Sequence, residues 1–557
     1  MRTGGKELLD IQRIVLIGFS GTGKSSIARQ LAERLGWTAI DTDRAIEIAA
    51  FKTIPEIFAA EGEAAFREIE REVLLRSLAC SSAVIATGGG AVISDEVWTT
   101  DLLNAPGTLT IALESSPDII LHRLRNQQAV GNQTIERPLL ATPDPFQRIA
   151  DLKQIRQHAY DRADLTLVTN EMTESEVISE IASVVVQTSE PDIVLDAPGG
   201  KSRIFVRPGI VDQGGALLAA QWPKARQAFV VTDANVGPLH GERVRQSLES
   251  AGLAVQTISV SSGEGSKSWE SAGSVIATML EGGIQRNDVV VALGGGVIGD
   301  LAGFVAAVVL RGVGIVQIPT SLLAMVDSSV GGKTGVNHPT GKNLIGAFYQ
   351  PPLVLADPEL LRTLPERELT QGWAEVVKHS VIQPSTPDRY GSDLFAFLQR
   401  NRANLADLRE PALTYAIRRN IALKASVVEA DEREANLRAI LNYGHTIGHA
   451  IEAAEYRYLH GEAISVGIHA ANRIARLEGR ITEEREQEIA DVLTAFGLPS
   501  RASFEPSVVR DRMKSDKKST AGRQTWVLPN GSKEVDLVTG IGDETIDSAL
   551  DFVRSLD

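Results

Sequence analysis

Cysteine is the scarcest residue of this 557-residue chain, which contains only Cys80. One thiol excludes a disulfide framework and a metal site built from several thiolates. It is typical of a protein from a reducing compartment, so we expect a cytoplasmic location. We expect Cys80 itself to be buried, because free cysteine usually behaves as a small apolar side chain.

The chain also lacks an excess of positive charge and long apolar runs. Its formal net charge of −15 excludes a general affinity for nucleic acid or anionic lipid, but a local basic cluster for a small anion remains compatible with it. The most apolar segment, residues 301–310, is about half as long as a membrane span. The apolar run at residues 14–19 is too short for the core of an export signal. We therefore expect neither a nucleic-acid partner nor a membrane partner.

The first domain is expected to span residues 1–188. Its β-branched runs at 14–17, 83–86 and 165–168 alternate with helical stretches. This alternation predicts an α/β domain in which a parallel sheet has helices on both faces. Residues 187–201 are rich in proline and glycine and are the best candidate for a linker.

Two more domains are expected after this linker. Residues 189–357 repeat the alternation and predict a Rossmann-like α/β domain. Helical periodicity dominates residues 358–557, apart from a strand-like run at 524–529. The predicted fold class is therefore α/β, with a phosphate-loop domain, a Rossmann-like domain and a mostly α-helical, metal-binding domain.

A phosphate-binding loop with the sequence GFSGTGKS occupies residues 18–25. It follows the first β-branched run and opens a helical stretch, so its glycine N–H groups can surround nucleotide phosphates at a helix N-terminus. We expect Lys24 to contact the terminal phosphates and Ser25 to ligate Mg2+, which predicts ATP binding. The expected ATP contacts are Gly21, Thr22, Gly23, Lys24, Ser25 and Ser26.

The acceptor of the phosphoryl group is indicated by charged residues elsewhere in this domain. Asp41 and Asp43 follow what looks like the second strand, where a carboxylate can hold a substrate hydroxyl. For Asp41 alone, a helix N-cap is an equally good interpretation. The other motifs are FRE at 66–68, TGGG at 87–90, RPLL at 137–140 and Arg156.

Together these motifs resemble the shikimate kinase family over nearly all of residues 10–185. The resemblance implies phosphoryl transfer from ATP to shikimate, with arginines clamping the substrate carboxylate. It places Arg137 in a lid that closes over ATP and excludes water. The segment between Arg125 and Arg137 lacks an arginine that many relatives carry, so more transition-state charge would rest on Lys24 and Arg137. The residues implied to bind shikimate are Asp43, Arg67, Gly89 and Arg156, and those implied to be catalytic are Lys24, Asp43 and Arg137.

A second glycine-rich turn, GGGVIGD, lies at residues 294–300. Its spacing allows a pyrophosphate to approach the backbone, but the acidic residue expected about twenty positions later is missing. The ribose of a dinucleotide would then be held elsewhere, for instance by residues 233–235. Two further glycine-rich loops carry Lys333, Lys342 and Asn343, which suit the capture of phosphate or carboxylate.

Three of the nine histidines lie within residues 442–462, namely His445, His449 and His460. By the helical period, Asn442, His445 and His449 share one helix face. Spacing alone predicts His445 and His449 as a zinc-binding pair four residues apart.

The motifs LNYGHTIGHA at 441–450, HGEA at 460–463, AEVVK at 374–378 and GGGVIGD resemble the 3-dehydroquinate synthase family, over about residues 190–557. This resemblance implies a different ligand set, in which Glu375, His445 and His460 hold the zinc ion, or Co2+, and His449 is not a ligand. It assigns proton transfer to His449, with Glu434 near it. It also implies bound NAD, a sugar acid phosphate (DAHP) as substrate, and a homodimer in which Arg311 reaches the neighbouring subunit's site.

The resemblance carries over further contacts residue by residue. Those implied for the substrate are Arg311, Asp327, Lys333, Asn343, Lys378, Lys424, Arg438, Asn442, His449 and Lys517. Those implied for NAD are Asp233, Ala234, Asn235, Glu264, Gly265, Ser266, Lys267, Gly295, Gly296, Val297, Asp300, Thr320, Ser321 and Lys342.

The two resemblances together predict a bifunctional enzyme of the shikimate route to chorismate. One alternative for the second half is a metal-dependent polyol dehydrogenase, which would accumulate NADH and would not need a phosphate cradle. The first half has two alternatives, another small-molecule kinase or a scaffold whose loop only senses ATP. The acceptor residues Asp43, Arg67 and Arg137 argue against a sensor, which has no need of them.

Overall fold

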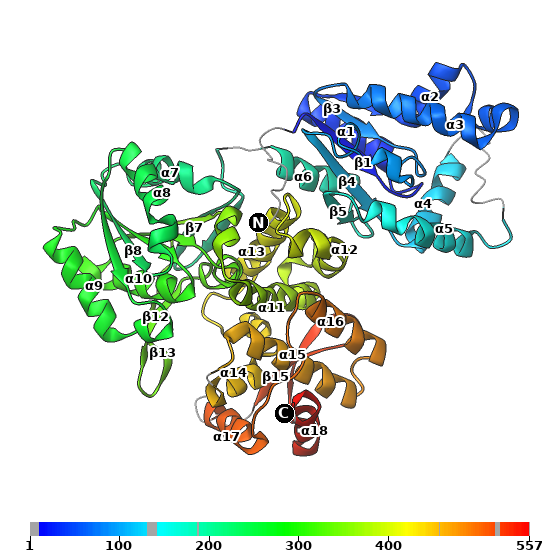
Figure 1. Ribbon diagram of the computed structural model, residues 1–557. Coiled ribbons are helices and arrows are strands. Elements are labelled where there is room, and N and C mark those ends of the chain that lie inside the picture. Colours follow the sequence, from blue (N-terminus) through cyan, green and yellow to red (C-terminus); the bar gives the residue numbers. More distant parts are fainter. Residues whose placement is uncertain (1–10, 131–141, 187–188, 456, 518–523, 556–557) are drawn as a thin grey trace. The chain divides into compact units, whose positions relative to one another are not determined.

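The computed structural model describes residues 11–130, 142–186, 189–455, 457–517 and 524–555. The chain forms two compact units. Unit 1 contains Met1–Thr188 and Tyr390–Leu413, and unit 2 contains Ser189–Arg389 and Thr414–Asp557. Each unit is described by itself (Figure 1).

Unit 1 is built on a five-stranded parallel sheet in the order β2-β3-β1-β4-β5. The three β-branched runs named above are strands of this sheet, as predicted, and their apolar side chains are buried between helices. The strands are β1 (Arg13–Ile17), β2 (Thr38–Asp41), β3 (Ala83–Ala86), β4 (Thr108–Glu114) and β5 (Leu165–Val168). The helices are α1 (Lys24–Leu35), α2 (Thr42–Ala50), α3 (Ile54–Leu78), α4 (Pro117–Val130), α5 (Pro145–Tyr160) and α6 (Glu174–Val185).

Unit 1 also includes a helix from much later in the chain, α12 (Leu394–Ala406). The side-chain amide of Asn401 accepts a hydrogen bond from Thr166 N at 2.8 Å and donates one to Thr166 O at 2.9 Å. Thr166 lies on the edge strand β5, whose outer backbone groups would otherwise lack a strand partner. Asn401 therefore satisfies part of the open edge of this sheet.

Cys80 follows α3 and is exposed, so the expectation that it is buried was wrong. It lies in the turn between α3 and β3. Its thiol contacts the carbonyl of Arg76 at 3.8 Å.

Unit 2 begins with a seven-stranded sheet in the order β6-β7-β14-β11-β10-β8-β9. The first strand, β6, lies within the predicted linker and pairs antiparallel with β7, so residues 187–201 are not all linker. All other pairs in this sheet are parallel, which confirms the predicted second α/β fold. The strands are β6 (Ile193–Ala197), β7 (Gly200–Val206), β8 (Gln227–Asp233), β9 (Ala254–Val260), β10 (Val289–Gly294), β11 (Gly314–Pro319) and β14 (Leu353–Ala356). The helices are α7 (Gly214–Gln221), α8 (Gly237–Ser250), α9 (Trp269–Glu281) and α10 (Gly296–Val308).

A hairpin and a helical part complete unit 2. The hairpin consists of β12 (Lys333–His338) and β13 (Gly341–Phe348), which pair antiparallel. The predicted strand at 524–529 exists as β15 (Thr525–Pro529), but its partner β16 (Val535–Thr539) was not predicted. The helices are α11 (Glu366–Ile382), α13 (Ala412–Ala430), α14 (His445–Ala454), α15 (His460–Leu477), α16 (Glu483–Ala495), α17 (Pro506–Lys517) and α18 (Asp543–Val553). Within the described ranges, no helix combines the length and the apolar character that crossing a membrane requires.

Candidate active sites and metal centre

The phosphate-binding loop connects β1 to α1, as the sequence predicts. Gly18, Gly21 and Gly23 have φ values of 136°, 87° and 91°, a region that favours glycine. A β-carbon on Gly18 would also lie 2.4 Å from the carbonyl oxygen of Leu113. Ser25 is exposed in the first turn of α1, where backbone N–H groups lack helical acceptors. The loop therefore presents N–H groups and a hydroxyl to an anion and its metal.

Lys24 lies buried at this loop. Its ammonium group donates hydrogen bonds to the carbonyls of Gly18 and Phe19, both at 2.9 Å. Burial lowers the pKa of Lys24 to about 8, although Asp43 and Asp41 oppose the change. A bound phosphate would give this ammonium group a negatively charged partner.

The predicted acceptor site forms around the turn at residues 88–90, which follows β3. A β-carbon on Gly88 would lie 2.6 Å from Asp43 Oδ1, and one on Gly90 would lie 3.0 Å from Arg67 Nη1. Arg156 Nη1 donates to the carbonyl of Gly89 at 3.3 Å. The structure thus brings Asp43, Arg67, Gly89 and Arg156 together.

Asp41 and Asp43 have different environments although they are only two residues apart. Asp41 accepts hydrogen bonds from the N–H groups of Asp43 and Arg44, so the N-cap interpretation of Asp41 was correct. Burial and the nearby Asp41 raise the pKa of Asp43, whereas Lys24 opposes this rise. Asp43 therefore faces the acceptor site as a carboxylate with an increased affinity for a proton.

Arg67 is held in place by a residue that sequence reasoning missed. Glu70 Oε2 lies 2.5 Å from Arg67 Nη1, and Glu63 Oε1 lies 3.1 Å from Nη2. The signal for Glu70 was its spacing, because residues three or four apart lie on one side of a helix. The predicted lid residue Arg137 lies outside the described residues.

In unit 2, three predicted metal ligands converge from three helices. Glu375 Oε1 lies 3.6 Å from His445 Nε2 and 3.4 Å from His460 Nε2. Two ligands that are each about 2.1 Å from a tetrahedral ion lie about 3.4 Å apart, so both separations fit a zinc-sized ion. Glu375 is fully buried, and its Oε2 forms an ion pair with Lys378. Its Oε1 accepts no hydrogen bond among the described residues and faces the two histidines, where a divalent cation would satisfy it.

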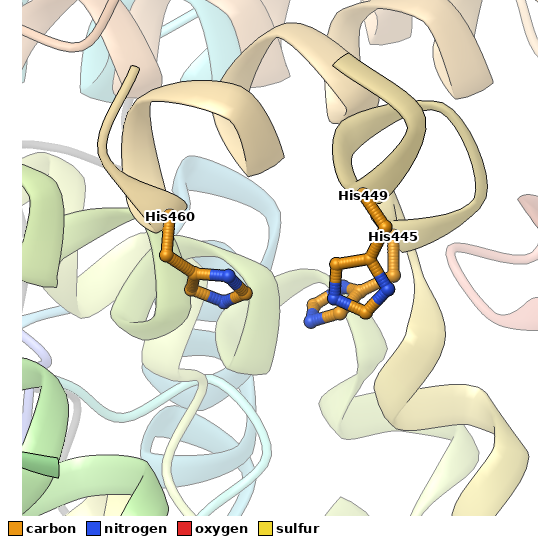
Figure 2. Close-up of side chains that lie close together, drawn as sticks. All are labelled: His445, His449 and His460. Atoms are coloured by element: carbon orange, nitrogen blue, oxygen red, sulfur yellow. The ribbon is translucent and has the colours of Figure 1, made fainter. Parts of the chain in front are cut away.

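His449 belongs to the same cluster (Figure 2). One ring nitrogen from each of His445, His449 and His460 lies within 4.8 Å of the other two. The geometry therefore contains two possible ligand sets, which differ in whether Glu375 or His449 is the third member. Burial distinguishes them, because Glu375 is fully buried whereas His449 is exposed and lines a cavity.

The other ring nitrogen of each predicted histidine ligand has an acceptor. His445 Nδ1 lies 3.1 Å from the carbonyl oxygen of Tyr443, and His460 Nδ1 lies 3.2 Å from Glu452 Oε2. Both acceptors require a proton on Nδ1, which leaves Nε2 to a metal. Neither Tyr443 nor Glu452 was predicted from the sequence.

Charges around this centre shift the pKa of its members in different directions. Burial raises the pKa of Glu375, but Lys378 and the two histidines outweigh burial and hold it well below its usual range. Burial and Lys378 push the pKa of His445 well below the ordinary value. Burial also lowers the pKa of His460, but Glu375 and Glu452 outweigh it and raise the pKa to about 9.

A cavity of about 590 Å³ adjoins the metal cluster. Eight of the ten residues predicted to bind the synthase substrate line it, together with Glu434, His445 and His460. The eight are Asp327, Lys333, Asn343, Lys378, Lys424, Arg438, Asn442 and His449. Arg311 is exposed and is not among the lining residues, and the side chain of Lys517 lies outside the described part of the chain.

One local prediction at this cavity was wrong. Asn442 does not share a helix face with His445 and His449, because it ends a 3-10 helix, η10 (Leu437–Asn442). Gly444, with φ of 79°, separates that turn from α14, which begins at His445. Asn442 nevertheless lines the cavity.

The residues predicted to bind NAD gather at one edge of the seven-stranded sheet. All except Lys342, which lies on β13 of the hairpin, follow the carboxyl ends of four neighbouring parallel strands, β11, β10, β8 and β9. This edge is where open α/β sheets bind their ligands. Asp233 ends β8, residues 264–266 form a turn after β9, Gly295 precedes α10, and Thr320 and Ser321 follow β11. Lys267 pairs with Asp300, and Lys342 Nζ lies 2.6 Å from Glu452 Oε1.

Comparison with protein families matches both halves of the chain. The 3-dehydroquinate synthase N-terminal model matches residues 257–371, and the C-terminal model matches residues 372–519. A 3-dehydroquinate synthase from Symbiobacterium thermophilum is 44% identical over 355 residues, which are 63% of this chain and 97% of the relative. The chain belongs to the 3-dehydroquinate synthase family. The synthase from Caulobacter vibrioides is 42% identical over 348 residues, 60% of this chain and 92% of that protein.

The shikimate kinase model matches residues 20–186. A shikimate kinase domain therefore precedes the 3-dehydroquinate synthase part on one chain.

Solved structures are similar to the synthase half. One is ValA, the 2-epi-5-epi-valiolone synthase from Streptomyces hygroscopicus subsp. jinggangensis, with NAD+ and Zn2+ bound. It has a TM-score of 0.57 and 27% identity over 66% of this chain and 98% of that one. A 2-deoxy-scyllo-inosose synthase in complex with carbaglucose-6-phosphate, NAD+ and Co2+ has a TM-score of 0.56 and 25% identity, over 64% of this chain and 98% of that one.

Proposed function

We propose that this bifunctional enzyme catalyses two steps of the shikimate route to chorismate. Unit 1 transfers a phosphoryl group from ATP with Mg2+ to the 3-hydroxyl of shikimate, and unit 2 converts DAHP to 3-dehydroquinate and phosphate with NAD and zinc or Co2+. One observation carries the synthase proposal, namely the convergence of Glu375, His445 and His460 beside a cavity lined by lysine and arginine.

The synthase site joins a metal centre to an anion site. The metal would supply polarisation of a substrate hydroxyl, and NAD a reversible hydride acceptor. Lys424 and Arg438 lie in the cavity wall, where they would hold the phosphate and carboxylate of a sugar acid. His449 reaches the same cavity and would take up and return a proton, with Glu434 near it. Similar structures solved with NAD+ and Zn2+ or Co2+ support this assignment.

The kinase site positions its substrates and balances their charges. Lys24 and the N–H groups at the start of α1 would bind the ATP phosphates, and Ser25 would ligate Mg2+. Arg67 and Arg156 would clamp the shikimate carboxylate, while Asp43 would orient the accepting hydroxyl. We assign Arg137 to the lid over ATP and Lys517 to the substrate of the synthase.

Three further assignments belong to this proposal. Residues 1–188 would form the kinase domain, residues 189–357 the NAD-binding domain and residues 358–557 the metal- and substrate-binding domain. The synthase half would form a homodimer in which the exposed Arg311, with φ of 68°, completes the neighbouring subunit's site. The single cysteine supports a cytoplasmic location, and we propose that neither nucleic acid nor a membrane is a partner.

The test supplies DAHP, NAD and zinc and follows phosphate release together with the absorbance of reduced nicotinamide. Phosphate without net NADH would support the synthase, whereas NADH accumulation on a polyol without phosphate release would support a polyol dehydrogenase. A parallel assay follows ADP formation with shikimate. The variant Lys24→Met should lower ADP formation by about 100- to 1,000-fold and leave phosphate release from DAHP unchanged. The variant His460→Ala should abolish phosphate release from DAHP and leave ADP formation unchanged.

A further inference from the structure

Glu452 is a carboxylate that joins two parts of the synthase site. It lies on α14 and is mostly buried, with 17% of its side chain exposed. Its Oε2 lies 3.2 Å from His460 Nδ1, and its Oε1 lies 2.6 Å from Lys342 Nζ. His460 begins α15, whereas Lys342 lies on β13 of the hairpin. Glu452 thus connects a proposed metal ligand to a lysine proposed to contact NAD.

The contact with His460 fixes how that ring faces the metal centre. A carboxylate only accepts hydrogen bonds, so Nδ1 must carry the proton that it receives. In the neutral ring the lone pair of Nε2 is then available to a metal, which displaces the second proton when it binds, and Nε2 lies 3.4 Å from Glu375 Oε1. An acceptor of this kind orients a histidine ligand and makes it a stronger electron donor.

His445 offers an internal comparison within the same centre. Its Nδ1 lies 3.1 Å from the carbonyl oxygen of Tyr443, a backbone acceptor that no side-chain substitution removes. A change at Glu452 should therefore affect the orientation of His460 alone. The centre would keep two correctly oriented ligands, Glu375 and His445, whereas the third, His460, would bind the metal more weakly.

We propose that Glu452 is a positioning residue, a role that rests on the proposed function. It orients His460 toward the metal, and it makes the affinity for the metal depend on what Lys342 binds. Lys342 shares the carboxylate charge with His460. An anion that draws Lys342 away leaves that charge to His460, which strengthens the hydrogen bond and the metal site. Binding of a dinucleotide pyrophosphate at Lys342 therefore favours binding of the metal.

The experiment measures the zinc dissociation constant of the full chain by competition with a chromophoric chelator. The variant Glu452→Gln should weaken zinc binding by about 10- to 100-fold, the range typical of lost partners of metal-bound histidine. The control is Glu455→Gln, the same substitution three residues later, where the carboxylate lies 3.9 Å from Arg457 and not at a histidine. Its zinc affinity should equal that of the unaltered protein.

Two further readouts separate positioning from a loss of folding. The visible absorption spectrum of the Co2+-loaded protein should change in Glu452→Gln, because the coordination of His460 changes, and Glu452→Asp should restore part of the affinity. Lys342→Met should tighten zinc binding in the unaltered background and have no effect in the Glu452→Gln background. Melting temperatures of the metal-free variants should lie within a few degrees of one another.

The outcomes distinguish this inference from the proposed function. If Glu452→Gln binds zinc within twofold of the unaltered protein while His460→Ala loses binding, the positioning role is wrong and the metal site stands. An equal effect of Lys342→Met in both backgrounds would overturn the link to Lys342. If the unaltered protein binds no zinc at all, the proposed function fails first.

Discussion

The two units place their cationic side chains in different surroundings. In unit 2, five lysines predicted to contact substrate or NAD each face a different carboxylate. The pairs are Lys267 with Asp300, Lys333 with Glu434, Lys342 with Glu452, Lys378 with Glu375, and Lys424 with Asp327. In unit 1, Lys24 and Arg156 instead donate to backbone carbonyls, and only Arg67 among the described site cations named above pairs with carboxylates, those of Glu70 and Glu63.

This difference shows two ways to build an anion site in an acidic protein. The carbonyl groups in unit 1 bring no full negative charge to Lys24, and burial lowers its pKa although Asp43 and Asp41 oppose this change. The carboxylates in unit 2 balance the lysine charges, so an incoming anion must exchange places with them. A change to one carboxylate in unit 2 should therefore disturb its lysine and the metal centre together, whereas unit 1 should respond residue by residue.

The largest effect is expected for Glu375→Gln in unit 2. This substitution removes the charge of a proposed metal ligand and leaves Lys378 buried without a charged partner. Phosphate release from DAHP should fall by at least about 1,000-fold, because the metal and the lysine are both disturbed. Phosphorylation of shikimate by the same preparation should not change. Retention of more than a tenth of the phosphate release would contradict the assignment.

The next largest effect is expected for Lys24→Met in unit 1. Loss of a cation that stabilises the transferred phosphoryl group should lower kcat for shikimate phosphorylation by about 100- to 1,000-fold. ADP formation in a coupled assay measures this effect. Lys52→Met is the matched control, since Lys52 lies in the same unit and pairs with Glu61 at 2.5 Å. An equal loss in both variants would point to a fault in folding.

A smaller effect is expected for Arg67→Lys. A lysine keeps the charge but cannot form the paired hydrogen bonds of a guanidinium with a carboxylate. The KM for shikimate should rise by about 10- to 100-fold, with a smaller change in kcat. Arg71→Lys on an exposed position of α3 should leave both constants unchanged. An unchanged KM in Arg67→Lys would remove Arg67 from the substrate site.

The smallest effect concerns pH. The free enzyme holds Lys24 with a pKa of about 8, below the ordinary value, so its ammonium is charged below this pH and neutral above it. Phosphate binds the charged form, and the KM for ATP should therefore rise above about pH 8, by up to about tenfold per pH unit. In Lys24→Arg, the side chain stays charged and the rise should disappear, whatever the rate of that variant. A rise that persists in Lys24→Arg would assign the titration to another group.

The sequence was most informative where function depends on neighbouring residues. The loop at residues 18–25 combines a strand, glycines and a helix start in one short segment, so its structure could be predicted directly. Residues 441–450 likewise predicted the helix α14, although Gly444 separates Asn442 from that helix. The metal ligands could not be predicted from spacing, which favoured His445 with His449, because Glu375, His445 and His460 come from three helices.

Contacts between distant residues could not be predicted from one sequence. Apart from Lys378, whose partner is three positions away, the lysines of the synthase site have carboxylate partners 33 to 110 positions away along the chain, and Asn401 lies 235 positions from Thr166. Such pairs depend on how the helices and strands pack, which local patterns do not specify. The same holds for Cys80, whose exposure depends on what covers the end of α3.

Whether Glu375, His445 and His460 hold the metal can be tested by anomalous diffraction at the zinc edge, using crystals of the full chain grown with zinc. We predict a single strong peak in unit 2 about 2.1 Å from Glu375 Oε1, His445 Nε2 and His460 Nε2, with His449 outside the ligand set. A peak bound by the three histidines without Glu375, or no peak at this cluster, would contradict the account.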